Sequence, residues 1–421
     1  MSRISFRGGT NEVGRSAIVV DTGSEKILMD YGVKLDEEAI SFPKPVNEKL
    51  SGILLSHGHL DHLGAIPRLF HNGQGCPIYG LEITSHFSRL LFNDSLKIAK
   101  QEGYELGYTS KDIKTALKHF KPIEYKSPFK IGKTEIIPFD AGHIPGSCMF
   151  LMESKKRILY TGDMKISDTR LVRGADTDIK DVDVLITEST YSDRDHPDRS
   201  KEERKFVEFV KATLDNDGVA IVSAFSISRT QEILLILDEF DVDWPIYIDG
   251  MCWGATQIIA SYPELQREYN SLKKSLQRMD AKFIDHPAKR RKIIKKPCII
   301  ITGSGMLSGG PVVHYIKKLY KKEECSLSLT GFQIPGTEGA ILLETGKFIH
   351  DGIELNVKMR IKKFNFSSHA SRTELINFCK KVNPERIFCI HGEKTEEFAM
   401  ELREDYGFDA ISPVCDNWYR I

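Results

Sequence analysis

Six short apolar runs of this 421-residue chain each end in a glycine or polar turn, and helix-like segments lie between several of them. The runs are SAIVVDTG, KILMDYG, GILLSHG, TEIIPFDAG, RILYTGD and DVLITEST. Aliphatic and β-branched residues bounded by turn residues predict strands, and a helix is predicted from about Leu81 to Glu102. This alternation is typical of layered folds, so the chain is expected to belong to the α/β class.

The length favours two or three domains rather than one. A second α/β unit is predicted from three apolar runs, each followed by a helical pattern, namely GVAIVSAF, WPIYIDG and CIIITGSG. The pattern of the first part of the chain, apolar runs that end in polar turns, then returns in MRIKKFNFSSHA and RIFCIHGE. Between them, Ser371 and Glu374 have the spacing of a capping box, which predicts the start of a helix. This order predicts an insertion, residues 191–357, within a host domain formed by residues 1–190 and 358–421.

Composition excludes some classes of protein. No apolar run is long enough to span a membrane, and the N-terminal MSRISFRGGTNEVGR lacks the apolar segment of a signal peptide. The eight cysteines are scattered without a CxxC pair, which predicts reduced thiols. We therefore expect a cytoplasmic protein with no membrane partner.

The charges balance at 59 basic and 59 acidic residues, yet they are unevenly distributed. Ten Lys or Arg residues stand against two Asp between Lys273 and Lys296, and Lys317, Lys318, Lys321 and Lys322 follow. Two interpretations stay open here, a solvated helix face and a surface that contacts phosphate groups.

The stretch SHGHLDHLGAIP places three histidines and an aspartate within six positions. It follows the predicted strand GILLS, and a loop there presents alternate residues on one side. His57 and His59 can then bind one metal ion while Asp61 and His62 turn toward another. Imidazole and carboxylate without thiolate favour zinc. The alternative, a hydrogen-bonded loop that is rich in histidine by chance, explains one such residue better than four.

Other ligand-type residues stand at, or shortly after, the ends of predicted strands. They are Asp30, His143, Asp163, Glu188, His369 and His391. Strand ends on one rim of a sheet converge in space, and a rigid scaffold builds a site in this way. Together with the histidine-rich loop they predict a two-metal centre.

These residues resemble the metallo-β-lactamase superfamily and, within it, the β-CASP nuclease branch. GGTNEVGRS, the strand ending in Asp30, HGHLDH, His143, TGDM and TEST resemble the lactamase-fold motifs and the first β-CASP motif. FSSHA and IHGE resemble the other two β-CASP motifs. The chain is most similar to the CPSF-type archaeal RNA-processing nucleases, in their short form without KH domains. The resemblance implies an αββα sandwich with an inserted α/β β-CASP domain.

The resemblance also implies a role for each residue. One zinc ion would be held by His57, His59 and His143, the other by Asp61, His62 and His391, with Asp163 bridging the two. The residues implied in catalysis are Asp61, Asp30, Glu188 and His369. Asp30 would orient the ligands, His369 would act as general acid, and Glu188 would hold the tautomer of His369.

The implied activity is that of a zinc-dependent ribonuclease that activates water with two metal ions, in RNA 3′-end processing or decay. Internal cutting and 5′-to-3′ trimming both stay open. A small-molecule hydrolase would need neither the insertion nor His369. DNA nucleases of the branch typically carry valine at the position of His391, so histidine favours RNA. A non-catalytic RNA-binding subunit is the remaining alternative.

Contacts with RNA are expected at several turns. The candidate residues are Ser228, Arg229, Ser304, Ser367 and Ser368. Backbone amides at helix starts and glycine-rich turns can bind phosphate, although such turns are often only tight turns. The C-terminal ISPVCDNWYRI is apolar for a tail, and in archaeal relatives the C-terminus mediates dimerisation, so a homodimer through this region is expected.

Overall fold

The computed structural model describes residues 2–35 and 40–421 and divides the chain into two compact units. The first unit comprises Met1–Asp168, Arg173–Asp195 and Ser368–Ile421, and the second comprises Thr169–Val172 and His196–Ser367. Both units combine helices and sheets. The α/β class expected from the sequence is confirmed.

Two seven-stranded sheets form the framework of the first unit. Their orders are β24-β1-β2-β3-β6-β7-β8 and β23-β22-β13-β12-β11-β10-β9. All six predicted runs are strands, namely β2, β3, β6, β10, β12 and β13. The strands are β1 (Arg3–Gly8), β2 (Ala17–Asp21), β3 (Lys26–Met29), β6 (Gly52–Leu54), β7 (Ile78–Leu81), β8 (Phe120–Ile123), β9 (Phe129–Ile131), β10 (Thr134–Asp140), β11 (Cys148–Glu153), β12 (Arg157–Tyr160), β13 (Val184–Glu188), β22 (Arg386–Ile390), β23 (Ala410–Ile411) and β24 (Trp418–Arg420), with a separate pair, β4 (Lys34–Leu35) and β5 (Ile40–Ser41).

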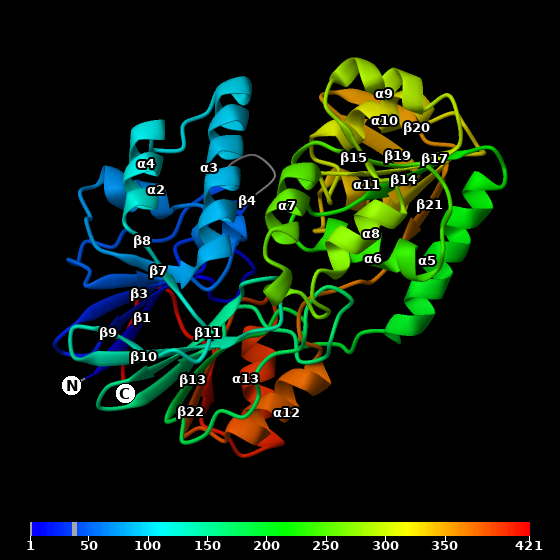
Figure 1. The fold of residues 1–421 in the computed structure, drawn as a ribbon. Helices are drawn as coiled ribbons and strands as arrows, with labels where there is room; N and C mark the ends of the chain where they lie inside the picture. The colour runs from blue at the N-terminus through cyan, green and yellow to red at the C-terminus, as the bar shows by residue number, and fades with distance from the viewer. Residues whose placement is uncertain (1, 36–39) are drawn as a thin grey trace. The chain divides into compact units, whose positions relative to one another are not determined.

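Helices cover the outer faces of these two sheets, which gives the four layers of an αββα sandwich (Figure 1). The sheets meet face to face, for example where the rings of Phe6 and Phe388 lie 5.1 Å apart. Helix α3 contacts β7 and β8, whereas α13 contacts β22 and β23. The expected capping box of Ser371 and Glu374 begins α12. The helices are α1 (Leu60–Leu63), α2 (Ile66–His71), α3 (Glu82–Glu102), α4 (Ser110–Lys118), α12 (Arg372–Val382) and α13 (Thr395–Glu404).

A six-stranded sheet of order β16-β15-β17-β14-β18-β21 forms the centre of the second unit. All its strand pairs are parallel. Its strands β14 and β17 are buried along their whole length because helices cover both faces. The strands are β14 (Val219–Ser223), β15 (Ile246–Asp249), β16 (Lys282–Ile284), β17 (Cys298–Thr302), β18 (Ser326–Leu329) and β21 (Arg360–Lys363), with a hairpin of β19 (Lys347–His350) and β20 (Ile353–Asn356). The helices are α5 (Arg199–Leu214), α6 (Arg229–Glu239), α7 (Met251–Ala260), η1 (Pro263–Leu265), α8 (Ser271–Arg278), α9 (Pro287–Ile293), α10 (Pro311–Leu319) and α11 (Glu338–Thr345).

The borders of the units differ in three places from the expected residues 191–357. The long segment of the second unit begins at His196 rather than at residue 191. Strand β21 pairs with β18, so the second unit extends to Ser367. The segment Thr169–Val172 also belongs to it, because Glu232 of α6 accepts hydrogen bonds from the backbone N–H groups of Arg170 and Leu171 at 2.9 and 2.8 Å. The second and third of these differences arise from pairing between residues far apart in the sequence.

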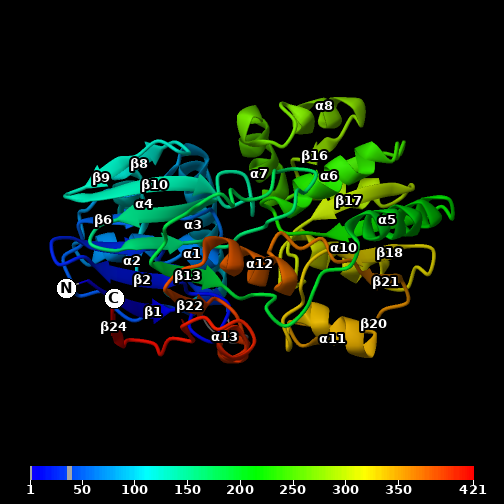
Figure 2. The ribbon, with the colours of Figure 1, turned by 90° about the horizontal axis from the view of Figure 1, so that it is seen from below.

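The C-terminal segment lies within the fold of the first unit. Strand β24 pairs antiparallel with β1, which places the two termini side by side (Figure 2). The ring of Tyr419 packs against Phe6 and Phe388. These contacts account for part of the apolar character of the tail. None of the helices in the described residues is long and apolar enough to cross a membrane.

Candidate metal centre

The histidine-rich stretch is a loop only as far as His59, because Asp61 and His62, which were expected in the loop, lie in α1. Backbone contacts with two neighbouring segments hold α1 in place. Tyr31 donates its N–H to the carbonyl of His62 at 2.7 Å, and Ser16 donates to the carbonyl of Asp61 at 2.9 Å. Gly32 is required here because a Cβ atom would lie 1.7 Å from the Asp61 carbonyl oxygen. The short helix that carries Asp61 and His62 is therefore fixed in position by main-chain hydrogen bonds.

Three imidazole nitrogens and one carboxylate oxygen converge in a first cluster. His59 Nδ1 lies 3.2 Å from Nε2 of both His57 and His143, and Asp163 Oδ2 lies 3.7 and 3.8 Å from the same two nitrogens. The ligand atoms of a tetrahedral zinc ion with bonds of about 2.0–2.2 Å lie roughly 3.3–3.6 Å apart. The nitrogen–nitrogen separations of 3.2 Å are slightly shorter than these edges, and the nitrogen–oxygen separations of 3.7 and 3.8 Å are slightly longer, so the four atoms lie close to a tetrahedral arrangement.

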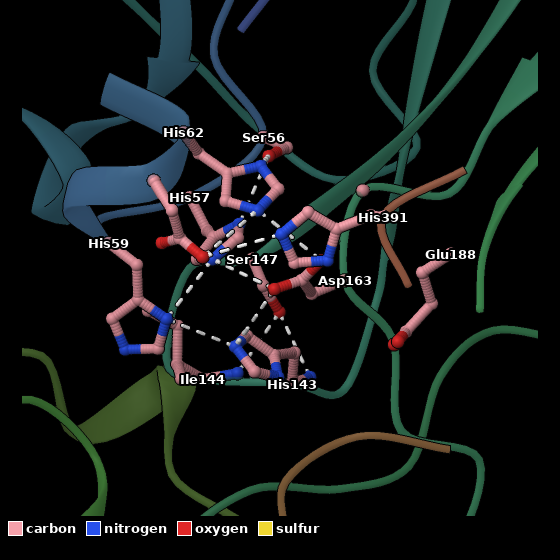
Figure 3. Close-up of polar contacts among 12 residues, drawn as sticks. Ser56, His57, His59, His62, His143, Ile144, Ser147, Asp163, Glu188 and His391 are labelled. Atoms are coloured by element: carbon pink, nitrogen blue, oxygen red, sulfur yellow. Dashed lines mark hydrogen bonds and ion pairs between the residues drawn. The ribbon is translucent and has the colours of Figure 1, made fainter. Parts of the chain in front are cut away.

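A second cluster shares Asp163 with the first (Figure 3). Asp163 Oδ1 lies 3.3 Å from His62 Nε2, and Asp61 Oδ2 lies 3.4 Å from His391 Nε2. The atoms His62 Nε2, His391 Nε2 and Asp163 Oδ1 are buried and have no hydrogen-bond partner. Buried polar atoms are almost always paired, and a cation between them would satisfy all three.

Outer hydrogen bonds fix the tautomers of the histidines. The Ser56 hydroxyl donates to Asp30, so His57 Nδ1, 3.0 Å from that hydroxyl oxygen, must be the donor to it. His143 Nδ1 donates to the Ser368 carbonyl at 2.8 Å. Each of these neutral imidazoles carries its proton on Nδ1, which leaves the Nε2 lone pair directed into the cluster.

Asp30 is the centre of this outer network. Its Oδ2 accepts hydrogen bonds from the Ser56 hydroxyl at 2.6 Å, from Nδ1 of His62 at 2.7 Å and from the Tyr160 hydroxyl at 2.6 Å. Its Oδ1 accepts the N–H of Ser56 at 2.7 Å. Asp30 is completely buried. These contacts hold His62 and the loop that begins at Ser56, and the role of Asp30 in orienting metal ligands, which the resemblance implies, stays a prediction.

The electrostatic environment favours neutral imidazoles in the first cluster and a negative charge on Asp163, the carboxylate that both clusters share. Burial lowers the pKa of His57 and His143 well below the usual value and that of His59 to about 4. Burial opposes the charge of Asp163, yet His391 and His62 outweigh it and hold the pKa of Asp163 well below its usual range. Neutral imidazole and ionised carboxylate are the forms that bind metal ions.

His391 is positioned by the chain around it. It directly follows β22 and has a positive φ of 50°, and its N–H donates to the Gly9 carbonyl at 2.7 Å. The Thr190 hydroxyl donates to the carbonyl of His391 at 3.1 Å. The GGTNEVG stretch near the N-terminus therefore supports a ligand-type residue near the C-terminus.

His369 and Glu188 form a pair beside the shared aspartate. His369 Nδ1 lies 3.1 Å from Glu188 Oε2 and 3.9 Å from Asp163 Oδ2. The His369 side chain is 21% exposed, whereas Glu188 is completely buried. Burial opposes protonation of His369, but Glu188 and Asp163 outweigh it and raise its pKa. Glu188 also accepts the N–H of Met164 at 2.7 Å, which holds its carboxylate in place.

Comparison with known proteins identifies the family. A metallo-beta-lactamase superfamily domain matches residues 18–190, a Beta-Casp domain matches residues 230–342, and a Zn-dependent metallo-hydrolase RNA specificity domain matches residues 354–413. A protein named Probable RNase MJ4, from Methanocaldococcus jannaschii, is 40% identical over 99% of this chain and 100% of its own length. The chain belongs to the β-CASP branch of the metallo-β-lactamase superfamily.

Other relatives of this β-CASP protein are named for action on RNA or in transcription. RNase aCSPSF2 from Saccharolobus solfataricus is 33% identical over 97% of this chain and 83% of its own length. Transcription termination factor FttA from M. jannaschii is 36% identical over 98% of this chain and 70% of its own length. A solved structure of a protein of unknown function from Enterococcus faecalis has a TM-score of 0.59 at 13% identity and covers 99% of both chains, which supports the fold alone.

The five residues expected to contact RNA lie in different surroundings within this β-CASP protein. Ser228 and Arg229 are buried at the start of α6, and the Arg229 guanidinium donates to the Thr330 carbonyl at 2.7 Å. The Ser304 carbonyl accepts from the Ser223 hydroxyl, the Ser367 N–H donates to the Asn365 side chain, and the Ser368 carbonyl orients His143. Their role in substrate binding stays a prediction.

Sequence reasoning missed four residues that orient the ligand-type histidines. Ser56 and Tyr160 hydrogen-bond to Asp30, Thr190 contacts His391, and the Ser147 hydroxyl accepts the N–H of His143 at 3.1 Å. The signal that could have found two of them is position. Ser56 directly precedes the first histidine, and Tyr160 ends the strand that leads to Asp163.

Proposed function

We propose that this chain is a zinc-dependent ribonuclease that hydrolyses phosphodiester bonds of RNA in 3′-end processing or decay. The observation that carries the proposal is the pair of His/Asp clusters that share Asp163, with the His369–Glu188 pair beside the shared carboxylate. The names of the relatives support RNA as the substrate. Cytoplasmic localisation belongs to the same proposal.

Two zinc ions are proposed, with seven ligands in two sets. The first set is His57, His59 and His143, the second is Asp61, His62 and His391, and Asp163 joins both. The near-tetrahedral separations in the first cluster and the buried atoms without a hydrogen-bond partner in the second support this assignment. When bound, such a pair of ions supplies the positive charge that polarises a phosphoryl group and activates water.

The residues of the chain itself hold ligands and move a proton. Asp30 and Ser56 keep the imidazoles in the tautomers that direct Nε2 inward. Nδ1 of His369 faces the Glu188 carboxylate and can donate a hydrogen bond to it. The other ring nitrogen, Nε2, is then the atom that can carry a proton to the substrate. We propose that this proton goes to the 3′-oxygen of the leaving sugar. A positioned acid typically contributes about 10²–10⁴-fold to the rate.

Metal analysis combined with cleavage assays tests the proposal. Protein purified without chelator should hold two equivalents of zinc and should cut end-labelled RNA in preference to DNA of the same sequence. Asp163→Ala should lose the shared ligand and most of the activity while circular dichroism remains unchanged. Binding of RNA without metal would instead support a non-catalytic subunit, and preferential cleavage of DNA would support a DNA nuclease.

A homodimer through the C-terminal region is also proposed. The residues Met400 and Val414 are 46% and 60% exposed. Ala399, Ile411 and Val414 are among the residues that line a groove between α13 and the C-terminal segment. Sedimentation should give the mass of a dimer, and Val414→Asp should shift it to that of a monomer. A monomeric wild-type protein would overturn this part of the proposal.

A further inference from the structure

One stretch of the second unit carries positive charge alone. From His286 to Lys322 the chain has ten Lys or Arg residues and no Asp or Glu, although the whole chain is balanced at 59 basic and 59 acidic residues. A solvated helix face usually alternates the two signs, because opposite charges three or four residues apart stabilise a helix. This stretch, which contains α9 and α10, does not follow that pattern.

Helices α9 and α10 lie on the same face of the six-stranded sheet (Figure 1). Ile293 at the end of α9 packs against the apolar core that contains Val312 and Tyr315 of α10. The buried carboxylate of Asp249 joins the two helices further. It accepts hydrogen bonds from the Arg290 guanidinium of α9 at 2.7 Å and from the Tyr315 hydroxyl of α10 at 2.6 Å. The outward sides of the two helices therefore adjoin each other.

The outward side of α10 is cationic along its length. The buried side chains of this helix are apolar or aromatic and face the core. The opposite side presents, at the spacing i, i+3, i+4 and i+7 of one helix face, His314, Lys317, Lys318 and, just beyond the helix end, Lys321. A rise of 1.5 Å per residue spreads these groups over about 10 Å. Lys317 contacts Asp351 of the β19–β20 turn at 3.8 Å, whereas Lys318 and Lys321 form no ion pair within the described residues.

The charges of α9 act on this same side of α10. Burial lowers the pKa of His314 first, and the charges of Arg290, Lys318 and Arg291 lower it further. Cations of both helices therefore surround a single imidazole. Arg290 pairs with Asp249, but Arg291 is exposed and has no ion pair in the part of the chain that the structure describes. The same holds for the three lysines that follow, namely Lys292, Lys295 and Lys296.

We infer that the outward side of α9 and α10 binds the phosphodiester backbone of RNA, through Arg291 and Lys318 and the exposed lysines beside them. The choice of RNA rests on the proposed function. A row of fixed cations has affinity for a polyanion because each contact releases counterions from the strand. A row about 10 Å long suits a chain of phosphates better than a single phosphate ion. Phosphate contacts carry no base identity, so this surface binds RNA irrespective of its sequence.

The charge argues against a second copy of the chain as the occupant. A two-fold contact would bring the same surface of both copies together, and like charges across an interface are unfavourable. An acidic protein would need carboxylates at matching positions, whereas RNA carries a phosphate at every nucleotide. RNA is therefore the occupant that the row of cations fits best.

Binding of a fluorescein-labelled single-stranded RNA at several salt concentrations tests the inference, with phosphorothioate linkages to slow hydrolysis. Arg291→Gln with Lys318→Gln removes one exposed cation from each helix and leaves the pair of Arg290 and Asp249 intact. This double variant should reduce the slope of log affinity against log salt by about 1.4, since each phosphate contact on a single strand contributes roughly 0.7. If the affinities converge at 1 M salt, that slope corresponds to about 25-fold weaker binding at 0.1 M. The loss should be equal for A-rich and U-rich strands.

Lys273→Gln with Lys274→Gln is the matched control. It removes two exposed lysines from α8, which packs against α6 and α7. The net charge of the protein changes equally in the two double variants, so a difference between them reports the position of the charges rather than their number. The control should keep the slope and the affinity of the wild type.

Acylation of lysines in the wild-type protein covers the case in which the double variant on α9 and α10 does not fold. Bound RNA should protect Lys292 and Lys318 from a small acylating reagent, as measured by mass spectrometry of peptides. The control positions, Lys273 and Lys274, should react equally with and without RNA.

Equal slopes in the two double variants, or equal acylation of Lys318 with and without RNA, overturn the inference. If the wild type still cuts RNA, the proposed function remains intact. Polyglutamate that competes as effectively as RNA of equal charge would indicate an acidic protein partner and also overturn the inference. A dimer that dissociates in the double variant on α9 and α10 but not in the control would overturn it as well. A wild-type protein that neither binds nor cuts RNA would end both.

Discussion

At the scale of single residues, one carboxylate oxygen controls the geometry of the metal centre. Oδ2 of Asp30 accepts from Ser56, His62 and Tyr160 together. If an amide nitrogen replaced this oxygen, it would face three donors and could accept from none of them. His62 would then lose the partner that holds its proton on Nδ1 and its lone pair on Nε2.

Asp30→Asn should therefore lower the affinity for zinc by about 10–100-fold, the usual cost of losing a partner that orients a ligand. Competition with a chelator of known affinity measures the change. Asp21→Asn, which removes an acceptor of Arg3 far from the clusters, serves as the matched control. Equal affinities in the two variants would show that Asp30 does not orient the ligands.

Replacement of His369 should change the rate of cleavage rather than the affinity for zinc. His369→Ala should keep both zinc ions and nearly normal RNA affinity but should cut about 10²–10⁴-fold more slowly, as expected for the loss of a general acid. Single-turnover cleavage together with metal analysis separates the two roles. Glu188→Gln is the companion variant, because it removes the charge that His369 Nδ1 faces at 3.1 Å. Loss of zinc in His369→Ala would make His369 a ligand instead, and a wild-type rate would exclude the acid role.

The sequence could predict the ligand-type residues but not their supports. Histidine and aspartate at the spacing of HGHLDH are informative in themselves, since few structures need that density of such groups. Serine, threonine and tyrosine are common everywhere. The roles of Ser56 and Tyr160 arise only when folding brings them to Asp30, across 26 and 130 positions of sequence.

At the scale of elements, a buried glutamate joins the two sheets of the first unit. Glu25, in the turn between β2 and β3, accepts from the hydroxyls of Ser24 and Thr134 at 2.6 and 3.0 Å and from the N–H of Lys133 at 2.9 Å. Burial opposes its charge, but the donors Ser24, Lys133, Thr22 and Thr134 outweigh it and lower its pKa to about 2. Ionised Glu25 therefore stabilises the folded state.

This contribution has a definite pH dependence. A carboxyl whose pKa is lower in the folded than in the unfolded state stabilises the fold above its unfolded pKa, and the effect is lost as the pH falls toward the folded value. Glu25→Gln should cost about 1–2 kcal/mol at pH 7 after allowance for solvent screening. The gap between wild type and variant in urea unfolding should shrink between pH 4.5 and pH 2. Exposed Glu105→Gln is the control, and a gap that did not change with pH would contradict the assignment.

Strand existence was easier to predict than strand pairing. The six apolar runs carry their own signal, and each is a strand. By contrast, the sequence of Arg360–Lys363 is mostly polar, and only its pairing with Ser326–Leu329 makes it a strand of the sheet in the second unit. Trp418–Arg420 likewise becomes a strand through β1, at the other end of the chain. Edge strands depend on distant partners, and local sequence does not report them.

At the scale of the whole molecule, the chain passes between the two units four times, after Asp168, Val172, Asp195 and Ser367. The order of the apolar runs predicted an insertion, because a pattern that stops and resumes indicates one domain placed inside another. The short crossing at Thr169–Val172 could not be predicted, since it depends on two backbone N–H groups that donate hydrogen bonds to Glu232.

Each unit has its own apolar core, formed in the first unit under α12 and α13 and in the second under α10. All seven proposed ligands come from the first unit. Zinc that binds only the folded first unit should stabilise that unit, by about 2.7 kcal/mol at a free concentration one hundred times the dissociation constant. Calorimetry should therefore resolve two transitions, of which a chelator lowers only one.

Asp163→Ala identifies the transition that depends on zinc. In this variant the shared ligand is absent, so the chelator should shift neither transition appreciably, and the transition of the second unit should match that of the wild type. Limited proteolysis during the thermal ramp would assign each transition to a unit, because fragments from residues 196–367 should persist longer when the first unit melts early. A single transition that moves as a whole with chelator would show that the two cores unfold cooperatively despite their separate packing.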